Sequence, residues 1–283
     1  YYYEVYCLGQ WGVTGKTVFN RERVSEQILK NIKPVSVGEF RYSYDGIRIS
    51  EIGWQDDEDG SVRIYEKPKP GRPYVVGGDT AGEGSDWFVG SVVDNVTGRQ
   101  VAVLRQRFDE DSYARQMYCL GKYYNDALIG IETNYSTYPQ KELERIGYKR
   151  FYTRQQEDSY THKPMQAFGF KTTKLTRPII IAELVSIVRD HAELVTDRVT
   201  LEEMLTFVRN EHGRAEAENG SHDDCVMALA IAYYIRPQQK AQDEEAVLTR
   251  RGWTSDMMED YRRAGTEEKK YLIRKWGQNE QEG

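Results

Sequence analysis

The pattern of apolar and polar positions is most regular between residues 74 and 132. Short runs rich in Val and Ile, bounded by turn residues, are typical of buried strands. Residues 109–125 instead carry acids in the first turn and apolar residues at helical spacing, as an amphipathic helix does. The pattern therefore predicts a helix there and strands at residues 74–79, 87–95, 99–108 and 127–132, with the second and third joined as a hairpin across the turn VTG.

The next hundred residues alternate shorter apolar runs with polar connections. We expect a helix that starts at Thr176, with Pro178 near its beginning, and a polar loop at residues 154–173. Further elements are expected as helices at residues 138–146, 201–209 and 221–234, a strand at 149–153 and a polar connection at 210–220. The order of strand, hairpin, helix, strand, helix, strand and then helices predicts an α/β fold with a mixed central sheet flanked by helices.

The two ends of the chain are less regular. Within residues 1–72 we expect a short helix at 21–32 and two strands, at 42–52 and 62–66. The acidic turn DDEDG separates the two strands. The stretch KPKPGRP, rich in proline, is interpreted as a linker. We therefore expect an N-terminal segment at 1–72, one domain at 73–237, and a charged tail at 238–283 with helical islands such as 255–263, loosely attached or disordered.

Composition narrows the class of protein. The 283 residues are 39% apolar and 30% charged, and nowhere is there a run of roughly 18–20 apolar residues that could span a bilayer. The first residues, YYYEVYCLGQWG, do not resemble a signal peptide, and the missing initiator Met suggests a fragment of a longer protein. The cysteines Cys7, Cys119 and Cys225 are far apart and form no CxxC, which favours neither a zinc site nor a disulfide framework.

Four acidic side chains stand where the predicted elements begin or end. Asp79 ends the first strand, Glu132 ends the strand after the first helix, and Asp223 and Asp224 open the last helix. Ligands bind at strand ends in open α/β sheets, so these carboxylates could converge. Hard oxygen ligands of this kind bind Mg²⁺ or Mn²⁺, and two such ions about 3.5–4 Å apart can cleave a phosphodiester.

Each acid also has a purely structural interpretation. Asp79 could open a turn, Glu132 could form a salt bridge, and Asp223 or Asp224 could cap the helix. His222 is interpreted as a turn residue or a support for a ligand, and Asp86 as structural. The net charge of -6 argues against a strong non-specific nucleic-acid binder. It leaves room for an enzyme that acts on DNA, because metal-binding carboxylates themselves add negative charge.

One segment contrasts with this acidic whole. Residues 149–177 contain seven basic residues against two acids, with aromatic residues between them. Basic groups neutralise phosphates without reading sequence, although a solvated loop would have the same composition. The candidate DNA contacts are Arg154, Lys163, Lys171, Lys174 and Arg177.

The ordered motifs YVVGGDTAGEGSD, ALIGIETN and SHDDCVMALAIAYYI resemble the ribonuclease H-like nuclease domain of the large terminase subunit of tailed bacteriophages. FGFKTTKLTRPIIIAEL resembles the stretch between that family's second and third acidic motifs. YEVYCLGQWG resembles the exit from its ATPase domain. The similarity covers most of residues 1–237. GVTGKT ends like a phosphate loop, but the glycine required five residues before Gly15 is Gln10, so we expect no ATP site.

The resemblance implies an endonuclease that cuts concatemeric double-stranded viral DNA during packaging. Asp79, Glu132 and Asp224 would be metal ligands, with Asp223 as a further ligand or close support, and Gly82 and Gly84 would let backbone approach the site. It also implies work in the host cytoplasm with the portal protein and the small terminase subunit. The alternatives are another nuclease of this fold, such as a junction resolvase or ribonuclease H, and a non-catalytic packaging or docking module.

Overall fold

A computed structural model describes residues 17–80, 87–107, 109–157, 164–250 and 252–276 of the chain. The chain divides into two compact units, residues 1–236 and residues 237–283, and each is described by itself below. Several residues named above lie outside the described part: Cys7, Gln10, Gly15, Gly82, Gly84, Asp86 and Lys163.

A mixed sheet of seven strands forms the centre of the first unit, in the order β2-β1-β3-β6-β5-β4-β7. Only β4 and β7 run parallel, and the other neighbours are antiparallel. The strands are β1 (Ser36–Asp45), β2 (Arg48–Asp56), β3 (Val62–Ile64), β4 (Tyr74–Asp79), β5 (Phe88–Asp94), β6 (Gln100–Gln106) and β7 (Leu128–Ile131). The predicted hairpin of β5 and β6 and the predicted strands β4 and β7 are confirmed.

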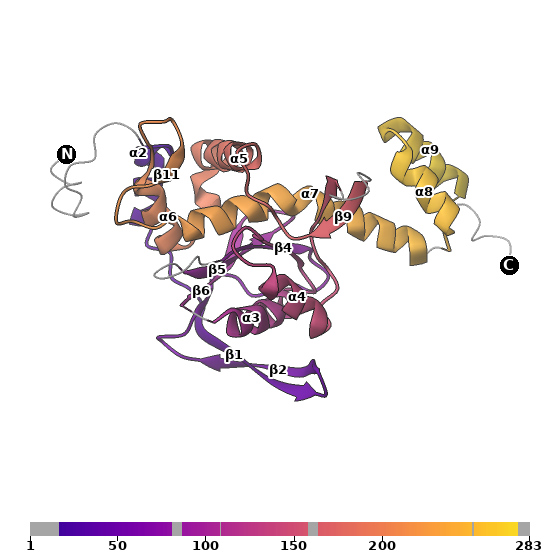
Figure 1. Ribbon diagram of the computed structural model, residues 1–283, viewed down its shortest axis with the longest axis horizontal. Coiled ribbons are helices and arrows are strands. Elements are labelled where there is room, and N and C mark those ends of the chain that lie inside the picture. Colours follow the sequence, from indigo (N-terminus) through magenta and orange to yellow (C-terminus); the bar gives the residue numbers. More distant parts are fainter. Residues whose placement is uncertain (1–16, 81–86, 108, 158–163, 251, 277–283) are drawn as a thin grey trace. The chain divides into compact units, whose positions relative to one another are not determined.

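Helices cover both faces of this sheet (Figure 1). One face, which includes Val76 and Ile129, is covered by α3 (Glu110–Tyr123) and α4 (Tyr138–Arg145). The other face, which includes Val75 and Leu128, is covered by α2 (Arg21–Leu29), α5 (Thr176–His191), α6 (Arg198–Leu205) and α7 (Asp224–Arg250). Neighbouring residues of one strand enter different clusters because side chains alternate between the faces of a sheet. Burial on both faces explains why β4 and β7 read as continuous apolar runs.

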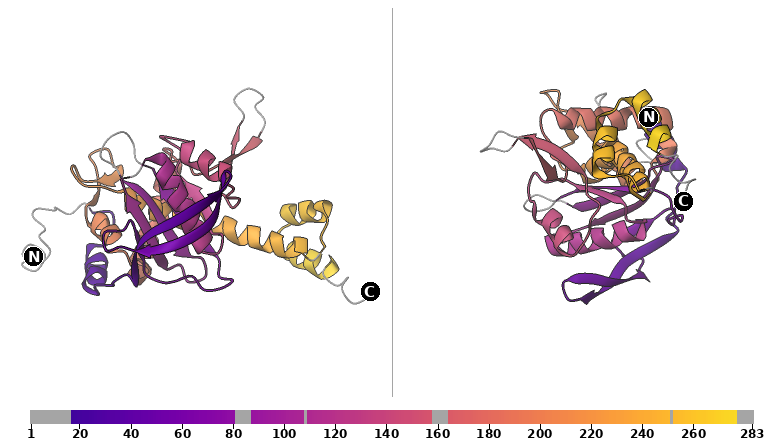
Figure 2. Two further views of the ribbon diagram at one scale, coloured as in Figure 1. Left: turned by 90° about the horizontal axis from the view of Figure 1, so that it is seen from below. Right: turned by 90° about the vertical axis from the view of Figure 1, so that its right-hand side faces the viewer.

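The sheet curls so that β1 and β2 reach the far side of α3, as Figures 1 and 2 show. The Gln116 side chain on α3 donates to the Phe40 carbonyl at 2.9 Å and accepts from the Phe40 N–H at 3.2 Å. Three strands from before residue 73 thus belong to the same sheet as β4, and the stretch KPKPGRP connects β3 to β4 within it.

Several expected elements differ from the structure. Residues 42–52 were expected as one strand, but the chain turns at Gly46, whose φ is 61°. The strand expected at 149–153 is reduced to an isolated bridge at Phe151. The polar loop expected at 154–173 contains a hairpin of β8 (Thr153–Glu157) and β9 (Pro164–Phe168). The helix expected at 201–209 ends at Leu205, and β10 (Phe207–Arg209) pairs with β11 (Ala215–Ala217) across the expected polar connection.

The second unit contains the end of α7, then α8 (Ser255–Arg263) and α9 (Thr266–Trp276). The short 3-10 turn η1 (Ala192–Leu194) belongs to the first unit, where it follows α5. Its apolar cluster contains Leu248, Met258 and Leu272, and the Trp253 ring meets the Trp276 ring at 5.2 Å. Residues 252–276 are therefore ordered as helices with an apolar cluster of their own, and the loose attachment expected for this tail stays a prediction. The helix expected at 255–263 is confirmed as α8.

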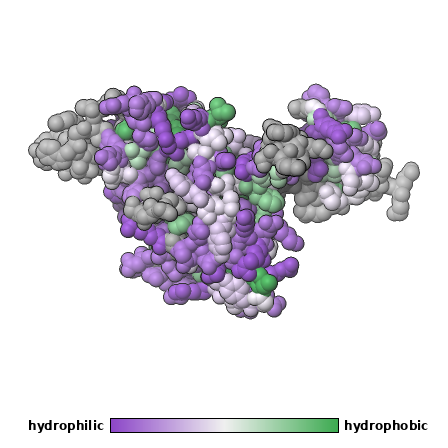
Figure 3. All heavy atoms as spheres, viewed as in Figure 1, coloured by the Kyte–Doolittle hydropathy of each residue, from purple (hydrophilic) through white to green (hydrophobic). Residues whose placement is uncertain are grey.

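The exposed face in Figure 3 is mainly hydrophilic, with small separate apolar spots, in line with a mean hydropathy of -0.73. None of the helices in the described residues has the length and apolar character needed to cross a membrane.

Candidate metal centre

Two acidic residues end neighbouring parallel strands at one edge of the sheet. Asp79 is the last residue of β4, and Glu132 directly follows β7. In the register of this pair Gly78 lies opposite Ile131, and the Glu132 N–H donates to the Gly78 carbonyl at 2.9 Å. The two strands are therefore neighbours in the sheet, and Asp79 and Glu132 leave it side by side.

Both acids also face the same side of the sheet. Asp79 shares its face with Gly77, and Glu132 shares its face with Gly130, because residues two apart in a strand point the same way. A Cβ added at Gly130 would lie 3.1 Å from Cδ1 of Ile235 on α7. The two carboxylates therefore leave the sheet on the face that α7 covers.

Helix α7 lies on β4 at backbone contact. A Cβ added at Gly77 would lie 2.2 Å from the Ala228 carbonyl oxygen and 2.3 Å from the Ala232 nitrogen, so only glycine permits this approach. Asp224 is the first residue of α7, about one turn before Ala228. The close approach at Gly77 thus brings the first turn of α7 to the strand end that carries Asp79.

The four predicted acids form one electrostatic cluster. Asp79, Glu132 and Asp224 are buried, with 7%, 6% and 9% of their surface exposed. Burial raises the pKa of Asp79 well above its usual range, and the charge of Glu132, a side-chain hydrogen bond with Glu132, and the charges of Asp224 and Asp223 raise it further. Three segments far apart in the sequence therefore place their carboxylates within mutual electrostatic reach.

Asp223 and Asp224 differ in their partners. The Arg177 guanidinium donates to Oδ2 of Asp223 at 2.7 Å and to the Ala215 carbonyl at 3.2 Å, so the charge of Asp223 is already compensated. Oδ2 of Asp224 lies 3.5 Å from Nδ1 of His222. Asp224 is the more buried acid and contributes more to the raised pKa of Asp79.

The chemistry of this cluster fits a hard divalent cation. Its donors are carboxylate oxygens, and buried carboxylates are stabilised when they bind a cation. Within the described residues, no three Asp, Glu, His or Cys side chains lie at the spacing of one completed metal site. A side-chain hydrogen bond with Glu132 is one of the causes that raise the pKa of Asp79, because such a bond favours the protonated form of one carboxyl beside the other carboxylate.

A fifth acid, Glu203 on α6, was not among the predicted site residues. Its Oε2 accepts from the Cys225 N–H at 2.8 Å and from the Val226 N–H at 3.2 Å. These N–H groups belong to the first turn of α7, where no intrahelical acceptor is available. Glu203 therefore caps the helix that begins at Asp224, from another element of the fold.

Glu203 is 7% exposed, and its surroundings act on it in opposite directions. Burial and then the charge of Asp224 raise the pKa of Glu203 to about 7, while the two N–H bonds and Arg105 lower it. Arg105 Nη2 stands 4.0 Å from Oε1 of Glu203, and the guanidinium lies 3.7 Å from the centre of the Trp87 ring. Glu203 is thus a further carboxyl group near Asp224, and the two N–H groups of α7 together with Arg105 partly compensate its negative charge.

The Glu203→Gln variant is expected to be less sensitive to pH than the wild type when the metal-free protein is unfolded in urea. The pKa is about 7 in the folded protein and about 4.3 in an unfolded chain. Because the folded pKa is the higher one, the contribution of Glu203 to the free energy of unfolding is fully present below about pH 4 and is lost as pH rises through 7, by up to about 4 kcal/mol. Gln keeps an acceptor for both N–H groups, so an unchanged pH dependence would contradict the prediction.

The predicted DNA contacts are in different environments. Arg154, on β8, donates from Nη1 to the Phe168 carbonyl at 3.0 Å and from Nη2 to Oε1 of Gln156 at 3.2 Å. Lys171 and Lys174 are exposed in the segment before α5. Arg177 is held between Asp223 and the Ala215 carbonyl, as described above, so a DNA phosphate would have to compete with both.

No protein-family model matches the sequence. Among solved structures, the large terminase nuclease from thermophilic phage G20c with bound magnesium has a TM-score of 0.53 and 18% identity, over 78% of this chain and 98% of that one. The same nuclease with bound cobalt gives the same values, and a further structure of it gives a TM-score of 0.51 and 19% identity over the same shares of both chains. The chain has the fold of these nucleases, which confirms the expected α/β, ribonuclease H-like mixed sheet flanked by helices.

Proposed function

We propose that this chain, which has the fold of the large terminase nucleases, is a metal-dependent endonuclease that cuts concatemeric double-stranded viral DNA. The observation that carries the proposal is the buried cluster of Asp79, Glu132 and Asp224, gathered from two strand ends and a helix start. A fold shared with nucleases that were solved with magnesium and with cobalt supports it.

In this proposal Asp79, Glu132 and Asp224 hold Mg²⁺ or Mn²⁺, as two ions, and Asp223 supports them. When bound, the ions would activate a water for in-line attack on the phosphodiester and stabilise the leaving 3′ oxygen. Because burial and the neighbouring carboxylates raise the pKa of Asp79, binding of a cation would favour its ionised form and release any proton that it holds.

The remaining residues position these acids and the DNA. Arg177 fixes Asp223 through its 2.7 Å ion pair, and we assign it this positioning role in place of the phosphate contact expected from the sequence. Glu203 fixes the first turn of α7. Arg154, Lys171 and Lys174, together with Lys163, would hold phosphates of the DNA, since basic side chains neutralise the backbone without reading sequence.

The cutting of a supercoiled plasmid tests this proposal. Purified protein with Mn²⁺ or Mg²⁺ is expected to nick and linearise the plasmid, to leave 5′ phosphates at the new ends, and to stop when EDTA removes the metal. A plasmid that stays intact with both ions, with the wild type and Asp79→Ala giving the same result, would refute the endonuclease.

A packaging role would add further partners to the same proposal. The chain would act in the host cytoplasm, beside the portal protein and the small terminase subunit. If branched DNA or RNA–DNA hybrids were cut in preference to plain duplex, the assignment would shift to another nuclease of this fold.

A further inference from the structure

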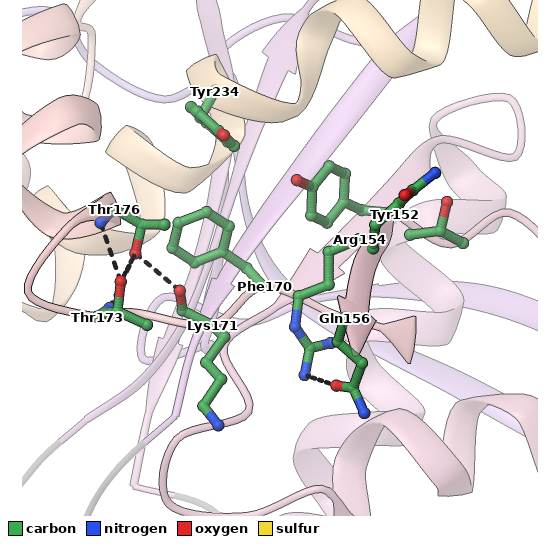
Figure 4. A pocket seen from close by; sticks show the side chains of 10 residues that line it. Tyr152, Arg154, Gln156, Phe170, Lys171, Thr173, Thr176 and Tyr234 are labelled. Carbon is green, nitrogen blue, oxygen red and sulfur yellow. Dashed lines mark hydrogen bonds between the residues drawn. The ribbon is translucent and has the colours of Figure 1, made fainter. Parts of the chain in front are cut away.

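A groove of about 650 Å³ is lined by residues of β8, of the segment that leads into α5, and by Tyr234 on α7 (Figure 4). Its wall includes Phe170, whose backbone forms a parallel bridge with Glu132. The Phe170 carbonyl accepts from the Thr133 N–H at 2.8 Å. The segment that forms one wall of the groove is thus hydrogen-bonded to the backbone around Glu132, the second acid of the site.

Three aromatic rings form one side of this groove. Ring centres of Phe170 and Tyr234 are 5.4 Å apart, those of Tyr152 and Phe170 are 6.3 Å apart, and those of Tyr152 and Tyr234 are 6.4 Å apart. Phe170 is buried, whereas Tyr152 and Tyr234 are partly exposed. Figure 4 shows the three rings grouped between β8 and α7. Such partly open aromatic groups offer faces on which a planar ligand can stack.

The rest of the lining is polar and positively charged. Arg154 and Lys171 contribute cations, and Gln155 and Gln156 contribute amides. No acidic side chain is among the described residues that line the groove, although the chain as a whole carries a net charge of -6. The cations and the aromatic rings of the groove together favour an anionic ligand that carries a planar ring. The volume of the groove, about 650 Å³, lies within the range of about 300–1,000 Å³ that is typical of ligand pockets.

We propose that the groove binds one unpaired nucleotide of the DNA strand that passes the acidic cluster, with its base against Tyr152 and Tyr234 and its phosphate near Arg154 and Lys171. The inference rests on the proposed function, because it takes DNA as the substrate. In an intact duplex the bases are stacked inside and only the grooves and the backbone are accessible. A concave aromatic wall therefore fits a base that has left its pair, for which stacking is the sequence-tolerant interaction.

The Tyr152→Leu variant tests this inference through binding of metal-free protein to DNA in EDTA, measured by fluorescence anisotropy with labelled oligothymidylate and with a labelled duplex. Loss of the ring is expected to weaken binding of the single strand about tenfold and binding of the duplex less than about twofold. Tyr152→Phe keeps the ring and is expected to bind the single strand as the wild type does. Tyr44→Leu, the same change at an exposed position on β1, should alter neither affinity.

The possible outcomes separate this inference from the nuclease itself. If Tyr152→Leu weakens both probes equally, or neither, while wild-type protein cuts plasmid with Mn²⁺, the groove holds no unpaired base and the endonuclease stands. If Tyr152→Leu and Tyr152→Phe lose single-strand affinity alike, stacking is refuted. If the single strand binds in a Tyr152-dependent way and no DNA is cut with either ion, the groove stands and the endonuclease is refuted.

Discussion

Replacing Asp79 with asparagine is expected to slow DNA cleavage by at least about a thousandfold, because a cation that loses a ligand no longer supplies several kcal/mol to the transition state. The variant should nevertheless fold. Asp79 is buried beside Glu132, and its raised pKa shows that its charge is unfavourable in the metal-free protein. A neutral amide of the same shape removes that repulsion, so the metal-free variant should be at least as stable as the wild type.

Two measurements on the same preparations distinguish the loss of a ligand from the loss of the fold. Plasmid cleavage with Mn²⁺ gives the rate, and calorimetric titration with Mn²⁺ alone gives the affinity for the metal. Asp45→Asn is the matched control, since Asp45 also ends a strand but is exposed at the β1–β2 turn. An Asp79→Asn protein that binds Mn²⁺ and cuts DNA at the wild-type rate would remove Asp79 from the site.

Replacing Gly77 with alanine is expected to destabilise the first unit by about 3 kcal/mol and to weaken both metal binding and cleavage. The new Cβ would stand 2.2 Å from the Ala228 carbonyl oxygen and 2.3 Å from the Ala232 nitrogen, and these are backbone atoms of α7, which cannot rotate away as a flexible side chain can. Helix α7 would have to move away from β4. Because α7 begins with Asp224, the same movement would withdraw a carboxylate from Asp79.

Gly53→Ala is the control for this change. Gly53 lies in β2, and an added Cβ there would meet only the Arg41 carbonyl oxygen, at 3.9 Å. Urea unfolding should show a loss for Gly77→Ala alone, and Mn²⁺ titration should show a weaker affinity for that variant. If Gly77→Ala is as stable as Gly53→Ala and binds Mn²⁺ like the wild type, contact with α7 does not set the position of Asp224.

The central strands and the acids at their ends could be predicted because both signals are local. A strand buried on two faces must be a short apolar run, and a carboxylate at its end stands out against that run. The turn at Gly46 had a local signal as well. The pair Asp45 and Gly46 between alternating residues is typical of a hairpin, and the prediction of one strand at 42–52 passed over it.

Other features depend on contacts that no local pattern records. Glu203 caps α7 from a different helix, and in the sequence it is one more glutamate of an amphipathic segment. Arg177 looked like a phosphate contact because it lies in a basic stretch, yet the fold places it against Asp223. The polarity of β8 and β9 was attributed to a loop, since a hairpin outside the main sheet has no strongly apolar face to reveal it.

The contact between Gly77 and α7 also bears on when the protein can first act. Synthesis proceeds from the N-terminus, so a nascent chain can pair β4 with β7 before the ribosome has made Asp224. Until then the strand ends carry Asp79 and Glu132 alone, without the third carboxylate or the helix that orients it. Under the proposed function, an unfinished polypeptide would be harmless to the DNA around it, and the capacity to cut would appear only after the last large helix had been translated and docked.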